Sequence, residues 1–221
     1  MKGEFLVCFD TDQIQNYVFA TNRLAEIRGA SYLLTCLEKE ALSELSGKFL
    51  PDGKVVYFQG GGGVAIVPDF EKANLLVQNI EKRYREETVS ASITGVVLPL
   101  APATGERDFG KRMQVAASML RKKKDEKAGC CWVPVEPFMQ PCTSCERFPA
   151  TEISLLDQRP VCEACYTKQR WDKSRKENEQ DSASPKDFAD IGERSLRSGY
   201  MGLLYVDVNN AGRQLAKLNS A

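Results

Sequence analysis

The sequence predicts an α+β chain, and three observations lead to this prediction. Apolar runs and helical patterns alternate along residues 4–98 in the order β-α-β-β-α-β, which is the ferredoxin-like split unit. Two Cys-x-x-Cys pairs follow that unit with the spacing of a zinc module. An apolar run that ends in Asp-x-[Asp/Asn] and leads into a helical pattern occurs twice, at Phe5–Phe19 and at Met201–Leu215.

In the first half of the unit, Glu4–Phe9 is a predicted strand and residues 14–45 are predicted to be helical. Glycine disfavours helix continuation, so an interruption is expected at Arg28-Gly29-Ala30. Lys54–Gln59 and Val64–Val67 are two further strands, and the four glycines between them indicate a hairpin.

In the second half, Asp69–Glu87 carries apolar residues at helical spacing, with Asp69 as its N-cap. Val89–Leu98 alternates and is rich in β-branched residues, so it is the fourth strand. Phe109–Lys127 is predicted to be another helix, whose apolar side carries Met113, Ala116, Ala117 and Leu120.

The C-terminal part is charged and then apolar. Residues 168–186 are expected to form a solvated helix or a mobile linker, because they hold almost no apolar side chains. A short helix is expected at 187–196, a strand at 202–208 and the start of a helix at 211–218. A lone strand with part of a helix cannot bury a core, so we expect a truncated piece of a longer protein.

These patterns divide the chain into four regions. Residues 1–128 are expected to form the ferredoxin-like domain, and residues 129–168 the zinc-binding module. The charged linker or helix covers residues 169–198. Residues 199–221 are expected to be the first strand and partial helix of a second domain of the first kind.

The composition excludes several classes of function. The 221 residues hold 30 Lys and Arg against 30 Asp and Glu, so net charge does not indicate a nucleic-acid binder. Apolar runs are too short to span a bilayer, and the N-terminus reaches acidic residues too early for a signal peptide. We therefore expect a cytoplasmic protein without a membrane partner. Histidine is absent, which removes His-based acid–base chemistry and His metal sites.

Four of the eight cysteines have metal-ligand spacing, namely Cys142, Cys145, Cys162 and Cys165. Each Cys-x-x-Cys pair puts two thiolates on one tight turn, and two turns complete a tetrahedron. Two disulfides are the alternative, which a reducing cytosol disfavours. Four thiolates leave no open coordination position, so the expected zinc holds the fold rather than doing chemistry. The other cysteines suggest no site: Cys8 and Cys36 fall on apolar faces, and Cys130-Cys131 receives no role.

Asp10 and Asp12 stand at the end of the first strand, beside a helix start. Carboxylates in this position commonly hold a divalent metal and a triphosphate. The palm domains of many nucleotidyl polymerases and cyclases have this element order and place carboxylates there. Capping of the helix that begins near Ile14 is the alternative role for Asp12.

The predicted hairpin offers only Gly60, Gly61, Gly62 and Gly63, where a catalytic palm carries carboxylates. A glycine run brings backbone N–H groups close to a phosphate or a base because no Cβ intervenes, but its side chains cannot bind a metal. A flexible hairpin tip is the alternative. The basic run Arg121–Lys124 near a helix C-terminus is favoured as a solvated face over an RNA site.

Several segments resemble, in the same order, the large palm-domain subunit of type III CRISPR effector complexes. Gln13–Phe19 and Arg28–Leu33 are similar to the family's first-palm segments, and Gly60–Gly63 to its degenerate hairpin. The four cysteines stand where the family has a zinc-binding domain, and Asp207–Gly212 is similar to the start of its second palm. Two positions depart from the family pattern: Asp12 replaces a serine, and Asn209 replaces the usual second aspartate.

The resemblance implies a nucleotidyltransferase of antiviral defence, or a compact relative of it. Such subunits make cyclic oligoadenylates from ATP, with magnesium or manganese, when the complex binds target RNA. The implied partners are ATP or a related nucleotide, CRISPR effector subunits, and guide and target RNA. The second palm supplies the catalytic carboxylates, and of these only Asp207 is matched here. Because the catalytic Gly-Gly-Asp-Asp hairpin would lie beyond Ala221, this chain alone is expected to be inactive.

The expected nucleotide contacts come from the first palm. They are Asp10, Asp12, Gln13 and Gly60–Gly63 around the nucleotide, with Ser31 and Tyr32 near the base or ribose by resemblance. Two other functions stay open. One is a non-catalytic module that holds partner subunits or RNA. The other is a GGDEF-like nucleotide cyclase relative, which the zinc module and the Gln-Ile-Gln-x-Tyr segment disfavour.

Overall fold

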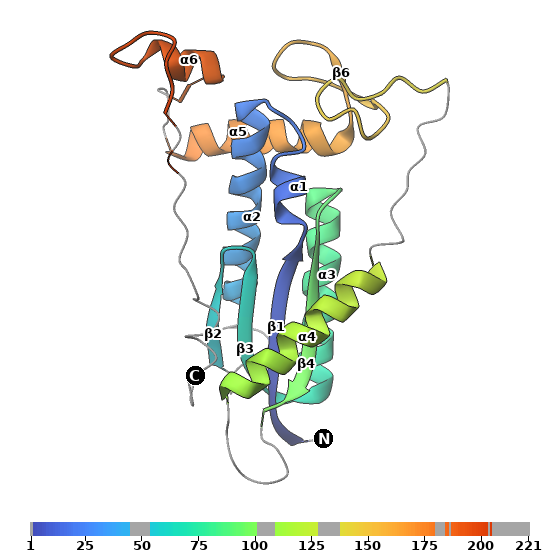
Figure 1. Cartoon of the computed structure of the whole chain (residues 1–221). Coiled ribbons are helices and arrows are strands. Elements are labelled where there is room, and N and C mark those ends of the chain that lie inside the picture. Colours follow the sequence, from blue (N-terminus) through green and yellow to red (C-terminus); the bar gives the residue numbers. More distant parts are fainter. Residues whose placement is uncertain are drawn as a thin grey trace.

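The computed structural model describes residues 2–44, 54–100, 109–127, 138–179, 184–185, 187–202 and 204 (Figure 1). Its elements, in chain order, are β1 (Lys2–Asp12), α1 (Ile14–Val18), α2 (Leu24–Glu44), β2 (Lys54–Gln59), β3 (Gly62–Asp69), α3 (Phe70–Thr88), β4 (Ser92–Pro99), α4 (Phe109–Lys127), β5 (Glu152–Ile153), β6 (Pro160–Val161), α5 (Glu163–Glu179) and α6 (Phe188–Glu193).

The first four strands form one antiparallel sheet in the order β2-β3-β1-β4. This is the strand order of the ferredoxin-like unit, so the predicted fold class is confirmed. The central strand β1 alternates between two cores. Val7 and Phe9 face the core beneath α2 and α3, whereas Leu6 and Cys8 face the core beneath α4. Figure 1 shows α4 crossing the face of the sheet opposite to α2 and α3.

The helices that flank the sheet follow their sequence patterns closely. The Asp69 side chain accepts hydrogen bonds from the backbone N–H groups of Glu71 and Lys72, so its predicted N-cap role is confirmed. The residues that α3 buries recur at helical spacing: Ala73, Leu76, Val77, Ile80, Tyr84 and Thr88. Helix α4 has the predicted bounds and buries Phe109 and Ala116 against the sheet.

The hairpin of four glycines is shorter than predicted. Only Gly60 and Gly61 form the turn, with φ values of 70° and 85°, a left-handed conformation that favours glycine. Gly62 and Gly63 belong to β3. A Cβ on Gly63 would overlap the ring of Phe58, so close packing, rather than flexibility, requires a glycine there.

The predicted helix interruption at Arg28-Gly29-Ala30 is wrong. Helix α2 runs without a break from Leu24 to Glu44, and the break falls earlier, between α1 and α2. Gly29 serves a different purpose, because a Cβ there would overlap the backbone carbonyl oxygen of Lys168 in α5. Glycine therefore lets two helices cross at close range.

Helix α5 is also more buried than the sequence indicated. It buries Lys168, Gln169 and Asp172 against α2. The predicted solvated helix therefore matches only the C-terminal half of α5. Figure 1 shows α5 lying across the end of α2, beside the cysteine module. The domain boundaries stay predictions, and α5 spans the one placed between residues 168 and 169. Apart from Gly202 and Leu204, the predicted second-domain strand and helix, with Asp207, lie outside the described residues, as do Cys130 and Cys131.

We expect Gly29→Ala to lower the stability of the protein by about 2–3 kcal/mol, as overpacking of a close contact does. In an unobstructed helix the same change would raise stability by about 1 kcal/mol, so the sign of the effect identifies the crossing. Urea unfolding followed by circular dichroism measures it. Thr35→Ala, an exposed position of the same helix, is the control and should change stability by less than about 0.5 kcal/mol. Equal effects of the two substitutions would contradict the role of Gly29.

Candidate functional site

Asp10 and Asp12 project from the end of β1 on the side of the sheet that α4 covers. Asp10 pairs in register with Gly62 of β3, so it lies beside the glycine hairpin as the palm arrangement requires. The Nζ atom of Lys124 in α4 lies 2.7 Å from Asp10 Oδ2 and 3.4 Å from Asp12 Oδ1. The strand-end carboxylates are therefore paired with cations of the chain itself.

The alternative role of Asp12, capping of the helix that follows, is not found. Gln13, with φ 47°, is the N-cap residue of α1, and its side chain makes no capping hydrogen bond. Asp12 accepts hydrogen bonds from Ser92 Oγ and Thr94 Oγ1 of β4, each at 2.7 Å. The aspartate is thus held by the neighbouring strand and not by the helix that follows it.

The expected solvation of the basic run Arg121–Lys124 is wrong for two of its members. Lys124 makes the contacts described above, and Lys123 Nζ donates to Glu81 Oε1 at 2.9 Å and to the Gly95 carbonyl oxygen at 2.8 Å. Burial acts to raise the pKa of Glu81, but hydrogen bonds from Gly95 N–H and Lys123 outweigh it, so the pKa is lowered overall. The run therefore builds part of the site.

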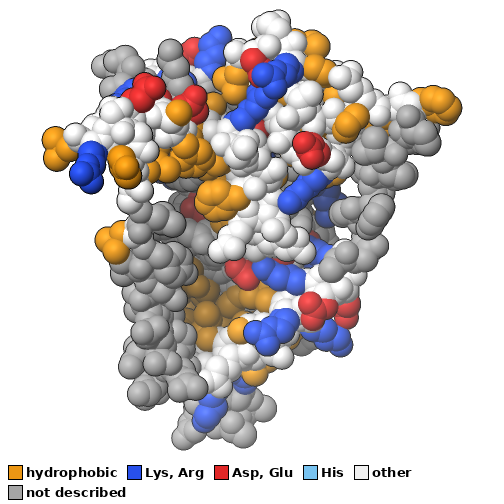
Figure 2. Space-filling view, turned by 45° about the horizontal axis from the view of Figure 1, so that its top comes forward, with side chains coloured by type: hydrophobic (Ala, Val, Ile, Leu, Met, Phe, Trp, Pro, Cys, Tyr) orange, Lys and Arg blue, Asp and Glu red, His pale blue; other side chains and the backbone are white. Residues whose placement is uncertain are grey.

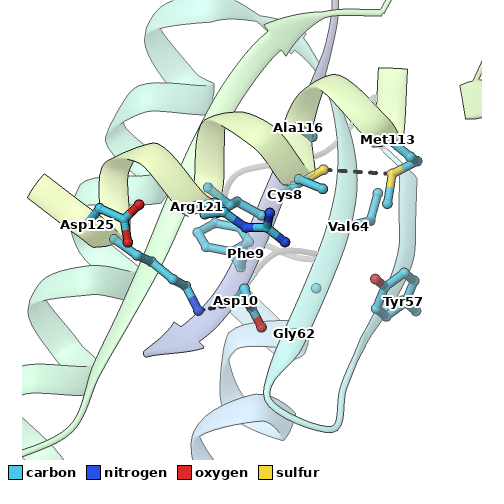
Figure 3. A pocket seen from close by; sticks show the side chains of 14 residues that line it. Cys8, Phe9, Asp10, Tyr57, Gly62, Val64, Met113, Ala116, Arg121 and Asp125 are labelled. Atoms are coloured by element: carbon cyan, nitrogen blue, oxygen red, sulfur yellow. Dashed lines mark hydrogen bonds and ion pairs between the residues drawn. The ribbon is translucent and has the colours of Figure 1, made fainter. Parts of the chain in front are cut away.

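A cavity of about 420 Å³, here called the α4 cavity, lies between α4 and the sheet (Figure 3). Asp10 and Gly62 border it on the strand side, and Arg121 reaches over it from the helix. Its floor includes Cys8, whose pKa burial raises to about 12, so this thiol stays protonated and inert. The predicted core role of Cys8 is confirmed, whereas Cys36 is only half-buried.

A second cavity of about 520 Å³, here called the α2 cavity, lies on the other side of the glycine turn. It brings together three predicted nucleotide contacts, Ser31, Gly60 and Gly61. Its walls are mainly apolar, and Glu38 of α2 is the buried charge in them. Glu38 Oε1 accepts the Gly61 N–H at 2.6 Å, which fixes the turn. The glycine hairpin thus separates two hollows that hold different predicted contacts.

The remaining three predicted contacts, Asp12, Gln13 and Tyr32, lie elsewhere. Gln13 borders a third cavity of about 470 Å³, between the sheet edge and the cysteine module, together with Asp12 and Arg147. Tyr32 packs against Trp171 of α5, with ring centroids 6.0 Å apart, and its hydroxyl accepts a hydrogen bond from Asn178. The structure therefore does not bring Tyr32 to the cavities that hold the other predicted contacts.

The four cysteines of the predicted metal site come together in one cluster. Their Sγ atoms all lie within 4.8 Å of one another, and Cys145 and Cys162 are 3.7 Å apart. A tetrahedron with Zn–S bonds of about 2.3 Å has sulfur–sulfur edges of about 3.8 Å, so the cluster fits a thiolate-bound metal ion. All four are free thiols in the structure, so the disulfide alternative is not the arrangement found. Hydrogen bonding from Cys145 and Cys162 raises the pKa of Cys165, and a bound cation would reverse this shift.

A buried polar network joins this cluster to the first domain. Glu26 of α2 is fully buried, and its Oε1 atom accepts from Ser144 Oγ and Gln169 Nε2, each at 2.8 Å. Lys168 Nζ donates to the Tyr17 carbonyl oxygen at 2.5 Å and lies 4.2 Å from the centroid of the Tyr17 ring. Burial lowers the pKa of Lys168, and the nearby Cys165 thiol and Glu26 oppose that shift. Lys168 is thus the buried positive charge beside the cysteine cluster.

Sequence reasoning missed Glu26 and Glu38, although a signal for both was present. Each lies four residues from a buried apolar residue of α2, Ala30 and Leu34 respectively, and so on the helix's apolar face. A carboxylate at such a position needs a buried partner. The glycine turn and the cysteine module supply those partners from distant parts of the sequence.

Comparison with known proteins finds likeness in structure alone. No family model matches this chain, and no curated protein matches it in sequence. The structural neighbours are Csm1 subunits of type III CRISPR-Csm complexes. The apo Csm1–Csm4 cassette has 20% identity and a TM-score of 0.47, covering 57% of this chain and 19% of that chain. Csm1 in T. onnurineus has 18% identity and a TM-score of 0.46, covering 57% of this chain and 20% of that one.

This chain thus spans about a fifth of the length of those neighbours. Other structures among them hold Csm1–Csm4 with cA3 or with AMPPNP. Likeness at this identity and TM-score says nothing about ligand or activity here. Separately, no helix in the described part of the chain has both the length and the apolar character needed to cross a bilayer.

We expect Lys168→Met to weaken metal binding by the cysteine cluster about tenfold, the usual effect of losing a group that supports metal ligands. The reason is that Lys168 offsets the negative charge of four thiolates and Glu26. Titration of metal-free protein with Co²⁺, followed by its thiolate charge-transfer absorption, measures the affinity. Lys173→Met, on the exposed side of α5, is the matched control. Equal Co²⁺ affinities of the two variants, both folded by circular dichroism, would contradict the role of Lys168.

Proposed function

We propose that this chain is the ATP-binding palm region of a CRISPR-type cyclic oligonucleotide synthase that acts in antiviral defence. One observation carries the proposal: a strand-end carboxylate, Asp10, lies in register beside a tight glycine turn, with a cavity on each side of that turn. This arrangement suits a nucleotide bound through backbone N–H groups. The ordered sequence motifs supply the ligand class and the family.

The α2 cavity has the chemistry that a nucleobase needs. Apolar side chains such as Ile14, Leu34 and Phe58 offer surfaces to the flat faces of a ring. Glu38 offers a buried carboxylate, which accepts hydrogen bonds from an exocyclic amino group. Ser31 borders the same cavity, which supports its predicted place near the base or ribose.

With the base in the α2 cavity, the phosphates of the nucleotide would lie at the glycine turn. Among the described residues beyond its chain neighbours, none has an atom within 4 Å of the position that a Cβ on Gly60 would take, so they leave the backbone open to a ligand there. Lys124 and Arg121 border the α4 cavity on the far side of the turn and provide positive charge for a phosphate chain. Asp10 and Gly62 line the same cavity.

We propose that zinc fills the cysteine cluster and that its role is structural. Four thiolates with tetrahedral spacing leave no position for a substrate. Magnesium or manganese would accompany ATP at the second palm, which carries the catalytic hairpin in the family that the motifs resemble. This chain alone is then a binding region without turnover, and the proposed role of Asp207 belongs to that second palm.

A non-catalytic module is the second candidate, and a specific observation favours it. Lys124 already pairs with the carboxylates that a catalytic palm uses for metal. Effector subunits and RNA are the proposed partners for both candidate functions.

Figure 2 shows acidic and basic side chains interspersed over one face, without a continuous basic stripe among the described residues there. Formation of cyclic product from ATP by a protein that includes the second palm would separate the two candidates.

We expect the chain to bind ATP, and Glu38→Gln to weaken binding about tenfold, since a hydrogen bond to a charged group contributes about 1.5 kcal/mol. Glutamine can still accept the Gly61 N–H, so the turn is kept. Isothermal titration with ATP and GTP measures affinity and base preference. Glu40→Gln, on the exposed side of α2, is the control. Absence of ATP binding, or an equal loss in both variants, would contradict the site; preference for GTP would favour a GGDEF-like relative.

We expect purified protein to hold one zinc ion, and its removal by a chelator to unfold the segment from Pro141 to Tyr166 and to lower the melting temperature. The stability of the palm should also fall, because Ser144 Oγ donates a hydrogen bond to the buried carboxylate of Glu26. Elemental analysis and thermal melts measure both effects. Cys145→Ser should reproduce the loss, whereas Cys36→Ser, outside the cluster, should retain the metal. Unchanged melting after chelation would overturn the assignment.

A further inference from the structure

The strand-end carboxylates already have a cation between them. Lys124 Nζ lies 2.7 Å from Asp10 Oδ2, 2.8 Å from the Thr11 carbonyl oxygen and 3.4 Å from Asp12 Oδ1. Two carboxylate oxygens and a backbone carbonyl oxygen are the kinds of ligand that a hard divalent cation takes. The ammonium group therefore occupies the position between Asp10 and Asp12 that a metal ion would need.

The second carboxylate has little capacity left. Asp12 Oδ1 and Oδ2 accept from Thr94 Oγ1 and Ser92 Oγ, and the side chain is only 15% exposed. Lys127 Nζ lies 3.9 Å from Asp12 Oδ2 and donates to the Ile93 carbonyl oxygen at 3.1 Å. A metal ion at Asp12 would have to displace hydrogen bonds that are already formed.

Helix α4 is anchored so that its lysines stay in place. Besides its contact with Asp12, Lys127 donates to Glu81 Oε1 at 3.3 Å, and Lys123 donates to the same oxygen at 2.9 Å. Glu81 Oε1 also accepts the Gly95 N–H at 2.9 Å. The carboxylate of Glu81 in α3 thereby ties two of the lysines to the sheet.

The charges of this cluster balance without a metal. Three carboxylates, those of Asp10, Asp12 and Glu81, face the three ammonium groups of Lys123, Lys124 and Lys127. Adding a divalent ion would leave two positive charges uncompensated in a partly buried site. The glycines of the hairpin offer no further carboxylate to compensate them.

We propose that the ammonium groups of Lys124 and Lys127 are the resident cations of this palm, so that Asp10 and Asp12 bind no divalent metal. A consequence, which rests on the proposed function, is that this palm binds its nucleotide with equal affinity with and without magnesium. Lys124, which is 23% exposed, lines the α4 cavity together with Arg121, and these two cations take the place of the metal in contacting phosphate.

Mn²⁺ binding, measured by electron paramagnetic resonance on zinc-loaded full chain, tests the first statement without any nucleotide. We expect no Mn²⁺ site in the wild type, and one new Mn²⁺ site in the double variant Lys124→Met, Lys127→Met. Addition of Asp10→Asn to that variant should abolish the new site. Lys122→Met, an exposed lysine of the same helix, is the control and should behave as the wild type.

Mn²⁺ binding by the wild type that is lost in Asp12→Asn would overturn the proposal, even if the double variant fails to fold. Nucleotide titration tests the consequence: ATP is added in resin-treated, metal-free buffer with and without MgCl₂, which leaves the zinc in place. Affinities within about twofold are expected, and a tenfold loss without magnesium would overturn the consequence. No ATP binding in either buffer would contradict the proposed function instead. In that case the Mn²⁺ result alone tests whether Asp10 and Asp12 bind a divalent metal.

Discussion

The crossing of α2 and α5 at Gly29 is the contact on which the rest of the structure depends. With no side chain at this position, the backbone of α5 comes against the backbone of α2. Arg28 can then pair with buried Asp172, with Nε 3.1 Å from Oδ1, while its Nη1 atom donates to the Pro185 carbonyl oxygen. Because α5 begins at Glu163, within the second Cys-x-x-Cys pair, the same crossing fixes the cysteine cluster against the palm. The cysteine module is consequently attached to the first domain by packing and is not a separate domain on a linker.

Helix α2 connects the two sites that sequence analysis treats as separate. Near its N-terminus, Glu26 accepts hydrogen bonds from Ser144 and Gln169 of the cysteine module. Twelve residues later, or about 18 Å along the helix, Glu38 holds the N–H of Gly61 at the glycine turn. Both carboxylates are buried, so each depends on the partners that it has. A change at the cysteine cluster would therefore act on the same helix that borders the proposed base cavity.

The sequence was sufficient for elements that local patterns determine and insufficient where distant segments meet. The strand order, the N-cap at Asp69 and the four-cysteine cluster follow from periodicity, capping chemistry and ligand spacing. Gly29 was misread because helix propensity is a local measure, whereas its reason for being glycine lies in α5, about 140 residues away in the chain. The lysines of α4 were misread for the same reason: a run of charge looks solvated until the fold places carboxylates beneath it.

Packing leaves little room for a side chain at two positions of the glycine hairpin, Gly61 and Gly63. A Cβ on Gly61 would lie 2.9 Å from the side chain of Ile14, and one on Gly63 would overlap the ring of Phe58. Phe58 in turn packs edge-on against Phe9 in the main core, with ring centroids 5.6 Å apart. An aspartate at Gly63 would have to shift this core aromatic residue before it could reach a metal, and Lys124 would still stand between Asp10 and Asp12. The glycines of the hairpin can therefore offer a ligand their backbone groups, but they supply no carboxylate for a metal ion.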